Sequence, residues 1–227
     1  MRELDNSAKV RVMASAKRRL LEIFCETSFK SSEKPVFRLA SGTLSKYYID
    51  CKQALSDPEA RALIGELIFE LTKAESFDSV GGLELGAYPI ATSVSDKIFH
   101  ERRRSVRAFV IRKEPKTHGV TDLVAGHVER GDNTLIVDDV VTTGNSTIKA
   151  IKGARKAGLS VSRVIVLVDR EEGDGKKNIE AEGVKFDALF TLAELREVSN
   201  ESAKQQHEEA CHGRPLRSQL VGAIVAG

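Results

Sequence analysis

The sequence predicts an α/β fold in which a mainly parallel, twisted sheet is flanked by helices. Short apolar runs typical of buried strands alternate with longer segments of helical apolar spacing, and this strand, turn and helix unit repeats along the chain. The chain has 227 residues, of which 41% are hydrophobic and 30% are charged. Such a chain can bury a substantial core, and its length favours one domain.

The predicted elements follow the order that a parallel sheet with crossover helices requires. A helix at 10–29 leads into short strands, and together with the entry elements they form a small N-terminal hood over about 10–56. Asp57-Pro58 begins a helix that ends near Ala74, because an acidic N-cap and a proline in the first turn are typical helix starts. The remaining elements are expected as strands at 36–39, 47–49, 79–82, 107–111, 134–137 and 163–168, with helices at 87–100 and at 146–157, the latter stopping at Gly158.

Composition and charge exclude several functional classes. Lys and Arg total 35 against 33 acidic residues, so a net charge of +2 gives no general attraction to nucleic acid or to a membrane surface. No apolar run approaches the ~20 residues that a membrane helix needs. The 3 cysteines form no CxxC pair and are odd in number, which favours a reducing compartment. We therefore expect a cytoplasmic protein with no nucleic acid and no membrane partner.

The end of the chain departs from this alternation. We predict a single domain over 1–198 and a C-terminal tail over 199–227, in which a polar stretch is followed by the short apolar LVGAIVAG. The composition favours disorder of the tail. Docking onto the body or onto a second subunit stays open.

The strongest chemical signal is LIVDDVVTTGNST, at 135–147. An apolar strand delivers Asp138 and Asp139 to a loop of small residues before a helix, where hydroxyls, a permissive glycine and unpaired backbone N–H groups meet. Such a nest binds phosphate, whereas carboxylates accept hydrogen bonds from a diol, so the motif predicts a sugar-phosphate site. A merely capped helix after a buried strand is the structural alternative. The residues expected to bind the ligand here are Asp138, Asp139, Val140, Val141, Thr142, Thr143, Gly144, Asn145 and Ser146.

This motif resembles the binding signature of type I phosphoribosyltransferases, and three further segments are similar to those of orotate phosphoribosyltransferases. They are FRLASGTLSKYYID at 37–50, FVIRKEPKTHG at 109–119 and LVDREEG at 167–173, which resemble the hood, the catalytic loop and the strand end that holds orotate. The resemblance covers roughly 24–198. It implies the type I phosphoribosyltransferase fold and Mg²⁺-dependent transfer of the 5-phosphoribosyl group from phosphoribosyl pyrophosphate to orotate. The products would be orotidine 5'-phosphate and pyrophosphate, in UMP biosynthesis.

The segment at 109–119 is also informative through its charge. Its cations outnumber its single acid, Glu114, so ion pairing cannot absorb the positive charge, although a solvated charge run is the alternative. If the ligand is phosphoribosyl pyrophosphate, the cations meet the leaving pyrophosphate. The residues expected in that role are Arg112, Lys113, Lys116 and His118.

The resemblance also implies how the catalytic groups are shared. Lys116 would act from a neighbouring subunit, which implies a homodimer, while Asp138 and Asp139 would act at or beyond the ribose. Mg²⁺ would be held mainly by the pyrophosphate and hydroxyls of the substrate. We therefore expect no metal ligand supplied directly by a protein-only cage.

Base selectivity is expected at Arg170, because a guanidinium can hold the orotate carboxylate as a planar fork. A surface ion pair with Asp169 is the structural alternative. The resemblance further implies that Thr142 and Tyr48 contact the base, and that Ser41-Gly42 shapes the pocket from the hood.

Two positions depart from the family pattern. Ala40 stands where many of these enzymes have Lys, and the turn Glu84–Ala87 stands where many have Tyr-Lys-Gly, so two cationic contacts are missing. The turn still offers backbone N–H donors to pyrophosphate before a helix. Close strand–helix packing is the alternative role for Gly81 and Gly82.

Two other functions stay open. One is a purine or other nucleobase phosphoribosyltransferase, which would share the aspartate loop but would not need the basic segment, the hood motif or Arg170. The other is a non-catalytic regulator that senses phosphoribosyl pyrophosphate through the same fold. Intact basic residues in the segment at 109–119 argue against the regulator.

Overall fold

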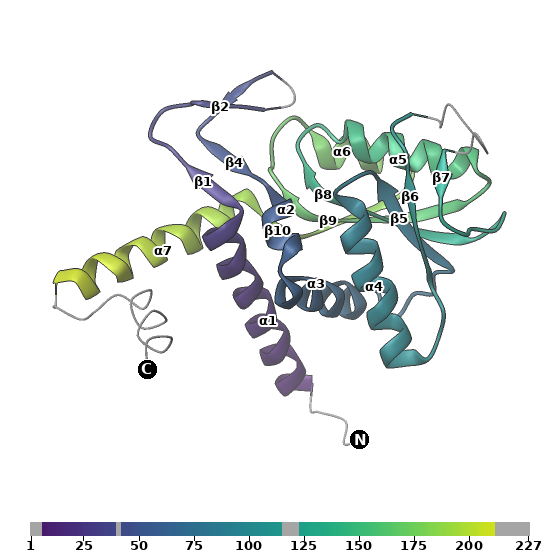
Figure 1. Cartoon of the computed structure of the whole chain (residues 1–227), viewed down its shortest axis with the longest axis horizontal. Coiled ribbons are helices and arrows are strands. Elements are labelled where there is room, and N and C mark those ends of the chain that lie inside the picture. The colour runs from purple at the N-terminus through teal and green to yellow at the C-terminus, as the bar shows by residue number, and fades with distance from the viewer. Residues whose placement is uncertain (1–5, 40–41, 115–122, 212–227) are drawn as a thin grey trace, which may run out of the picture.

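The computed structural model describes residues 6–39, 42–114 and 123–211, and it has a central sheet with helices on both faces (Figure 1). The strand order is β10-β9-β8-β5-β6-β7, in which β7 pairs antiparallel with β6 and the other pairs are parallel. The predicted α/β fold with a mainly parallel sheet is therefore confirmed.

The predicted elements occur in the predicted order. Seven further elements of the described residues were not predicted, namely α2, α6, α7, β1, β3, β7 and β10. The helices are α1 Asn6–Thr27, α2 Cys51–Ser56, α3 Pro58–Leu71, α4 Ala87–Arg102, α5 Asn145–Lys156, α6 Gly175–Glu180 and α7 Leu192–Cys211. The strands are β1 Phe29–Ser31, β2 Phe37–Arg38, β3 Leu44–Ser45, β4 Tyr47–Ile49, β5 Ser79–Leu83, β6 Arg107–Ile111, β7 Val124–Ala125, β8 Asn133–Val141, β9 Ser160–Asp169 and β10 Lys185–Thr191.

Alternate side chains of the central strands fill two separate cores. Leu135 and Val137 of β8 are buried on the face covered by α1, α3 and α4. Ile136, between them in the chain, is buried on the opposite face with Ile151 of α5 and Ile179 of α6. This alternation is the period-two pattern of a strand, and it makes both faces of the sheet apolar, as a parallel sheet requires.

Strand β8 is longer than predicted, and the difference moves the two aspartates. The predicted strand ended at Val137, whereas β8 continues to Val141 because Asp138, Val140 and Val141 pair with residues of β9. Asp138 and Asp139 therefore lie within the strand and not in the loop after it. Successive side chains of a strand point to opposite faces, so the two carboxylates have different surroundings.

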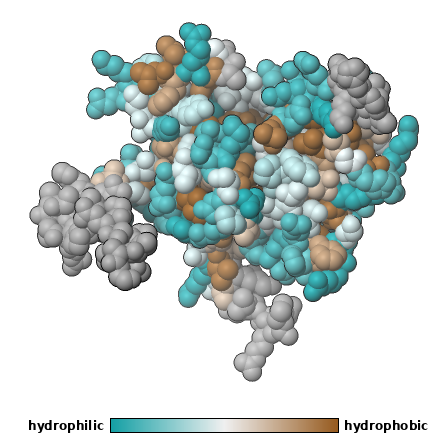
Figure 2. Space-filling model, in the orientation of Figure 1, coloured by the Kyte–Doolittle hydropathy of each residue, from teal (hydrophilic) through white to brown (hydrophobic). Residues whose placement is uncertain are grey.

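The hood consists of β1 to β4, which project from the body near the start of α7 (Figure 1). Strand β1 pairs with β4, and β2 pairs with β3, both antiparallel. Figure 2 shows hydrophobic side chains on the hood, and Val36 and Leu44 of this region are 59% and 53% exposed. The predicted helix at 10–29 ends earlier, at Thr27, because Phe29 starts β1 and pairs with Ile49.

Helix α7 continues across the predicted boundary at 198. Its first turns bury Leu192, Leu195 and Val198, and ion pairs of 2.7 Å (Lys17–Glu194) and 2.8 Å (Arg18–Glu201) join it to α1. Residues 199–211 are therefore helical, and the remainder of the predicted tail lies outside the described residues. None of the described helices combines the length and the apolar character needed to cross a membrane.

The predicted start of the helix after Asp57 provides a test of the local sequence argument. The Asp57 carboxylate accepts a hydrogen bond of 2.7 Å from the backbone N–H of Glu59, and Pro58 occupies the first turn. Asp57→Ala should lower the free energy of unfolding by about 1 kcal/mol, because the N–H loses its acceptor. Thermal unfolding followed by circular dichroism should show a Tm lower by ~2–4 °C. Asp57→Asn keeps an acceptor and should lose less, and an equal loss would contradict the capping role.

Candidate functional site

The predicted binding segments lie at the carboxyl ends of four neighbouring parallel strands. Strand β5 is followed by the β5–α4 turn (Glu84–Gly86), β6 by Arg112, β8 by the β8–α5 loop (Thr142–Gly144) and β9 by the β9–α6 segment (Arg170–Asp174). Carboxyl ends of parallel strands meet at one edge of the sheet, which is where α/β proteins bind ligands. The topology thus brings together segments that are spread over residues 84–174 of the sequence.

The β8–α5 loop has the geometry of an anion nest. Gly144 has a φ of 81°, and a Cβ there would meet Cγ1 of Ile179 at 2.9 Å, so this position requires glycine. Helix α5 begins at the next residue, and the first N–H groups of a helix have no partner within it. A hollow of 420 Å³ lies over these groups and is lined by residues 140–147. The loop can therefore hold a phosphate, as predicted from its composition.

Asp138 lies beneath this loop and bonds to protein groups. Its side chain is buried, and its carboxylate accepts hydrogen bonds from the Thr147 hydroxyl at 2.7 Å and from the Asp139 backbone N–H at 3.0 Å. Burial, followed by the charge of Asp139, raises the pKa of Asp138 to about 7. Asp138 thus supports the start of α5 through Thr147, a contact that the sequence did not reveal.

Asp139 faces the other way and stays half-buried. Its Oδ1 accepts a hydrogen bond of 2.9 Å from the Val140 backbone N–H. Its carboxylate lies against the β5–α4 turn, because a Cβ on Gly86 would be 2.5 Å from Oδ2. Of the two predicted acids, Asp139 is therefore the one that lies between two binding segments.

The glycines before the β5–α4 turn serve close packing. A Cβ on Gly81 would meet the carbonyl oxygen of Phe109 at 2.5 Å, and one on Gly82 would overlap the carbonyl oxygen of Val137. Both neighbours are backbone atoms of adjacent strands and cannot move aside cheaply. Both glycines thus serve close packing against neighbouring strands. The strand–helix packing given above as the alternative holds for Gly82, where a Cβ would be 2.7 Å from that of Ala87 in α4.

The described part of the basic segment is tied to the same turn. The Arg112 N–H bonds to the Leu123 carbonyl at 2.8 Å, which closes the base of the segment between β6 and β7. The Lys113 N–H bonds to the Glu84 carboxylate at 2.8 Å. Lys116 and His118 lie outside the described residues. Glu84, which departs from the family pattern, therefore has a structural function here that sequence reasoning missed.

Arg170 is almost fully buried, and its ion-pair partner is Glu172 and not Asp169. Its Nε donates to Glu172 Oε2 at 3.0 Å, and its Nη2 contacts Glu172 Oε1 at 3.4 Å. Nη2 also donates to Ser45 Oγ at 3.1 Å and to the Tyr47 carbonyl at 3.4 Å. The Asp169 carboxylate instead accepts from the Glu171 N–H. The ion pair with Asp169, given above as the alternative, is therefore wrong.

A pocket of 270 Å³ lies between the β8–α5 loop and two residues that bond to Arg170. Glu172 and Ser45, which both bond to Arg170, line it together with Thr142, which the family resemblance assigns to the base. Its walls come from the hood, the β8–α5 loop and the β9–α6 segment. The residues that line it are Leu39, Thr43, Leu44, Ser45, Thr142, Thr143, Glu172 and Gly173.

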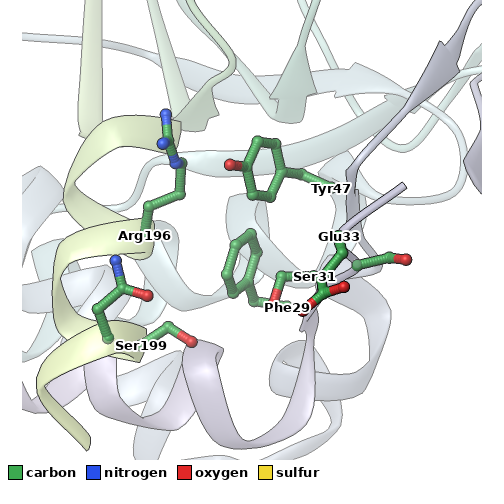
Figure 3. A pocket seen from close by; sticks show the side chains of 8 residues that line it. Phe29, Ser31, Glu33, Tyr47, Arg196 and Ser199 are labelled. Atoms are coloured by element: carbon green, nitrogen blue, oxygen red, sulfur yellow. The ribbon is translucent and has the colours of Figure 1, made fainter. Parts of the chain in front are cut away.

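The structure brings Tyr47, more directly than Tyr48, to Arg170. The Tyr48 ring stacks on Phe37 with 5.8 Å between ring centres, and no hydrogen bond of the described residues joins it to Arg170. Tyr47 reaches Arg170 with its carbonyl, while its ring turns into a separate pocket of 310 Å³ (Figure 3). There the ring stacks on Phe29, and the Arg196 guanidinium lies 4.8 Å from its centre. Gly42 has a φ of 87°, and Ser41 lies outside the described residues.

Known proteins resemble this chain over most of its length. The phosphoribosyl transferase domain family matches residues 52–190. The orotate phosphoribosyltransferase of Aquifex aeolicus is 44% identical over 177 residues, which cover 78% of this chain and 96% of that protein.

Solved structures give the same result. The orotate phosphoribosyltransferase of Mycobacterium tuberculosis has a TM-score of 0.68 at 37% identity, covering 79% of this chain and 98% of that chain. A second structure of that enzyme, in complex with 5-phospho-α-D-ribosyl 1-diphosphate, has a TM-score of 0.63 at 32% identity, covering 80% and 92%. With its type I phosphoribosyltransferase fold and N-terminal hood, the chain belongs to the orotate phosphoribosyltransferase family.

Proposed function

We propose that this protein is an orotate phosphoribosyltransferase that transfers the 5-phosphoribosyl group from phosphoribosyl pyrophosphate to a ring nitrogen of orotate. Its products are orotidine 5'-phosphate and pyrophosphate. The observation that carries the proposal is that Arg170 bonds to Ser45 and Glu172, which line one pocket with the β8–α5 loop. A guanidinium that can bind a carboxylate therefore lies beside a nest that can bind a phosphate.

The substrate is divided among the binding segments by charge. The 5-phosphate fits the β8–α5 loop and the start of α5, with its unpaired N–H groups. The ribose hydroxyls fit Asp139, whose carboxylate can accept hydrogen bonds and would repel a phosphate. The pyrophosphate fits the β5–α4 turn and the basic segment that starts at Arg112, because Glu84 ties these two together.

Charge separation during the reaction explains the placement of the basic residues. The bond between the anomeric carbon and the pyrophosphate oxygen breaks, and pyrophosphate leaves with the electron pair. The bond between that carbon and the orotate ring nitrogen forms, and this nitrogen releases its proton to pyrophosphate or to water. Positive charge grows on the ribose ring and negative charge on the leaving group. Lys113, Lys116 and His118 are proposed to stabilise the latter, and a closed basic segment would exclude water from the activated sugar.

Mg²⁺ is the proposed cofactor, and the donor set fits an ion held mainly by the substrate. Among the described residues, no group of three or more His, Cys, Asp and Glu side chains could hold a metal. Asp138 is committed to Thr147, whereas Asp139 is half-buried and can accept a substrate hydroxyl or a water on the ion. When bound, Mg²⁺ would neutralise the leaving pyrophosphate.

A homodimer and a cytoplasmic location complete the proposal. The dimer rests on the resemblance of the segment at 109–119 to a loop that acts in the neighbouring subunit's site. The location is supported by Cys25 and Cys51, which are both free thiols. Cys51 is buried in the core. Such thiols are ordinary in a reducing compartment.

Loss of orotate absorbance tests the activity directly. Purified protein with phosphoribosyl pyrophosphate and Mg²⁺ should consume orotate, and parallel assays should contain uracil, hypoxanthine or adenine. Turnover with a purine and not with orotate would favour the purine phosphoribosyltransferase. No turnover with any base would favour the non-catalytic regulator.

Arg170→Ala tests the assignment of the base site. The substitution should raise the KM for orotate by roughly 10- to 100-fold, because a charge-assisted pair of hydrogen bonds to the carboxylate is lost. The KM for phosphoribosyl pyrophosphate should stay unchanged. Arg170→Lys keeps the charge but not the planar fork and should recover only part of the affinity. An equal rise in both KM values would place Arg170 elsewhere in the mechanism.

A further inference from the structure

The edge of Arg170 that could bind a ligand carboxylate already holds a carboxylate of the chain. Nε and Nη2 form one edge of the guanidinium, and both contact the two carboxylate oxygens of Glu172, at 3.0 and 3.4 Å. This is the paired arrangement that guanidinium groups prefer with carboxylates. The Arg170 side chain is only 3% exposed, so this arrangement leaves little room for a second carboxylate.

We propose that Glu172 lowers the affinity for orotate: its carboxylate occupies the place of the orotate carboxylate on Arg170 and leaves when orotate binds. The inference rests on the proposed function, in which Arg170 receives that carboxylate. It adds a competition within the site: orotate binds by exchanging one carboxylate for another on the same guanidinium edge. The free energy that Arg170 contributes to orotate binding is then the difference between the free energies of its ion pairs with orotate and with Glu172.

Glu172 is placed so that it can leave. Its side chain is 39% exposed, and Arg170 is the one hydrogen-bonding or ionic partner of its carboxylate among the described residues. Released from Arg170, the carboxylate can be hydrated, which keeps the free-energy cost of the exchange small. Gly173 follows with a φ of 63°, so the chain turns directly after Glu172.

Arg170, by contrast, is held where it is. Ser45 Oγ and the Tyr47 carbonyl both accept from Nη2, and they do not depend on Glu172. The Tyr47 ring is fixed in turn between Phe29 and Arg196, as Figure 3 shows. When Glu172 leaves, the guanidinium therefore keeps its position, and an incoming carboxylate meets a fork that is already oriented.

Only a base that carries a carboxylate has to displace Glu172. Orotate replaces the Arg170–Glu172 pair with an equivalent pair, so little interaction is lost when Glu172 leaves. Uracil has the same ring without the carboxylate and offers Arg170 no replacement, so it leaves the pair intact. Glu172 therefore lowers the affinity for orotate and leaves that for uracil unchanged, which moderates the preference of Arg170 for a base with a carboxylate.

Glu172→Gln tests the proposal, with Glu171→Gln as the matched control. Both substitutions remove one negative charge from the same segment, but among the described residues no hydrogen bond or ion pair joins the Glu171 side chain to Arg170. Glu172→Gln should lower the KM for orotate about threefold to fivefold, the usual range for a partly exposed ion pair. The kcat, the KM for phosphoribosyl pyrophosphate and the inhibition constant of uracil should not change, and Glu171→Gln should behave like the unchanged protein.

Direct binding of the product gives a second readout. The dissociation constant of orotidine 5'-phosphate, measured by calorimetry, should fall by the same factor in Glu172→Gln, because the product carries the same carboxylate. An unchanged or raised orotate KM in that variant would overturn the inference, since Glu172 would then only position Arg170. An equal fall for uracil would also overturn it, because the effect would not pass through the carboxylate. Absence of orotate turnover by the unchanged protein would instead reject the proposed function, and the inference with it.

Discussion

Lys116→Ala is expected to lower turnover by about 10²–10³-fold, the loss that follows removal of a donor to a charge that develops in the transition state. The charge on pyrophosphate grows as its bond to the ribose breaks, so a cation there stabilises the transition state more than the bound substrates. The kcat should therefore fall far more than the affinities for either substrate. Steady-state kinetics, together with the dissociation constant of phosphoribosyl pyrophosphate, would separate the two effects.

Two variants serve as controls for this experiment. Lys116→Arg keeps a cation and should retain more turnover than Lys116→Ala. Lys152→Ala removes a lysine that is 66% exposed on α5 and pairs with Glu182, so its turnover should match that of the unchanged protein. Unchanged turnover in Lys116→Ala would reject the catalytic role.

Mixed dimers would show whether Lys116 acts in the neighbouring subunit's site. A subunit with Lys116→Ala can be combined with one carrying Asp139→Asn, which is inactivated at the proposed ribose contact. If the basic segment crosses between subunits, one site of the mixed dimer has both an intact Asp139 and an intact Lys116. Mixed dimers isolated with two affinity tags should then regain about half of normal turnover, because one of two equivalent sites is complete. If each subunit uses its own Lys116, neither site is complete and no activity returns.

Most of the fold could be predicted because its signals are local. The run Arg107–Ile111 is a strand with the predicted bounds, and the helix predicted to stop at Gly158 does so because Gly158 has a φ of 88°, which favours glycine. The short hood strands β1 and β3 were not predicted. They have three and two residues, too few for an alternating pattern, and depend on their pairing partners.

The sequence predicted which segments form the site, but it did not predict in which direction their side chains point. The motif identified Asp138 and Asp139 as a pair, yet the extra pairing of β8 with β9 turns Asp138 into the protein and leaves Asp139 at the ligand side. Likewise, the hood motif contained two adjacent tyrosines, and only the strand pairing decides that Tyr47 meets Arg170. Adjacency in sequence carries no information about such tertiary contacts.

Ion-pair partners were equally hidden from sequence reasoning. Arg170 pairs with Glu172, two residues away, because the chain turns after β9 and brings that carboxylate back to the guanidinium. The Glu84 carboxylate accepts a hydrogen bond from the Lys113 N–H because β5 and β6 are neighbours in the sheet. Both contacts could have been suspected from charge alone, but only the topology selects them among the many acids of the chain.

The burial of Asp138 predicts a second large effect, on stability. Its pKa is about 7 in the folded protein, against an ordinary value of 3.8, so at intermediate pH the folded state holds a proton that the unfolded state has released. Stability is therefore lost as pH rises from about 4 to above 7. Asp138→Asn has no charge to bury, and its amide can still bond to Thr147. Chemical denaturation should show that it is more stable than the unchanged protein at pH 8, by up to about 4 kcal/mol, and no more stable near pH 4.

Asp139→Asn separates the two causes of this effect. Burial is the larger cause of the raised pKa of Asp138, and the charge of Asp139 is the next. Removing that charge should lower the pKa of Asp138 and reduce the stability lost between pH 4 and pH 8, without abolishing the loss. Complete loss of the pH dependence would assign the effect to charge repulsion alone. Equal stabilities of Asp138→Asn and the unchanged protein at every pH would mean that Asp138 is hydrated in solution, and the support of α5 through Thr147 would then fail as well.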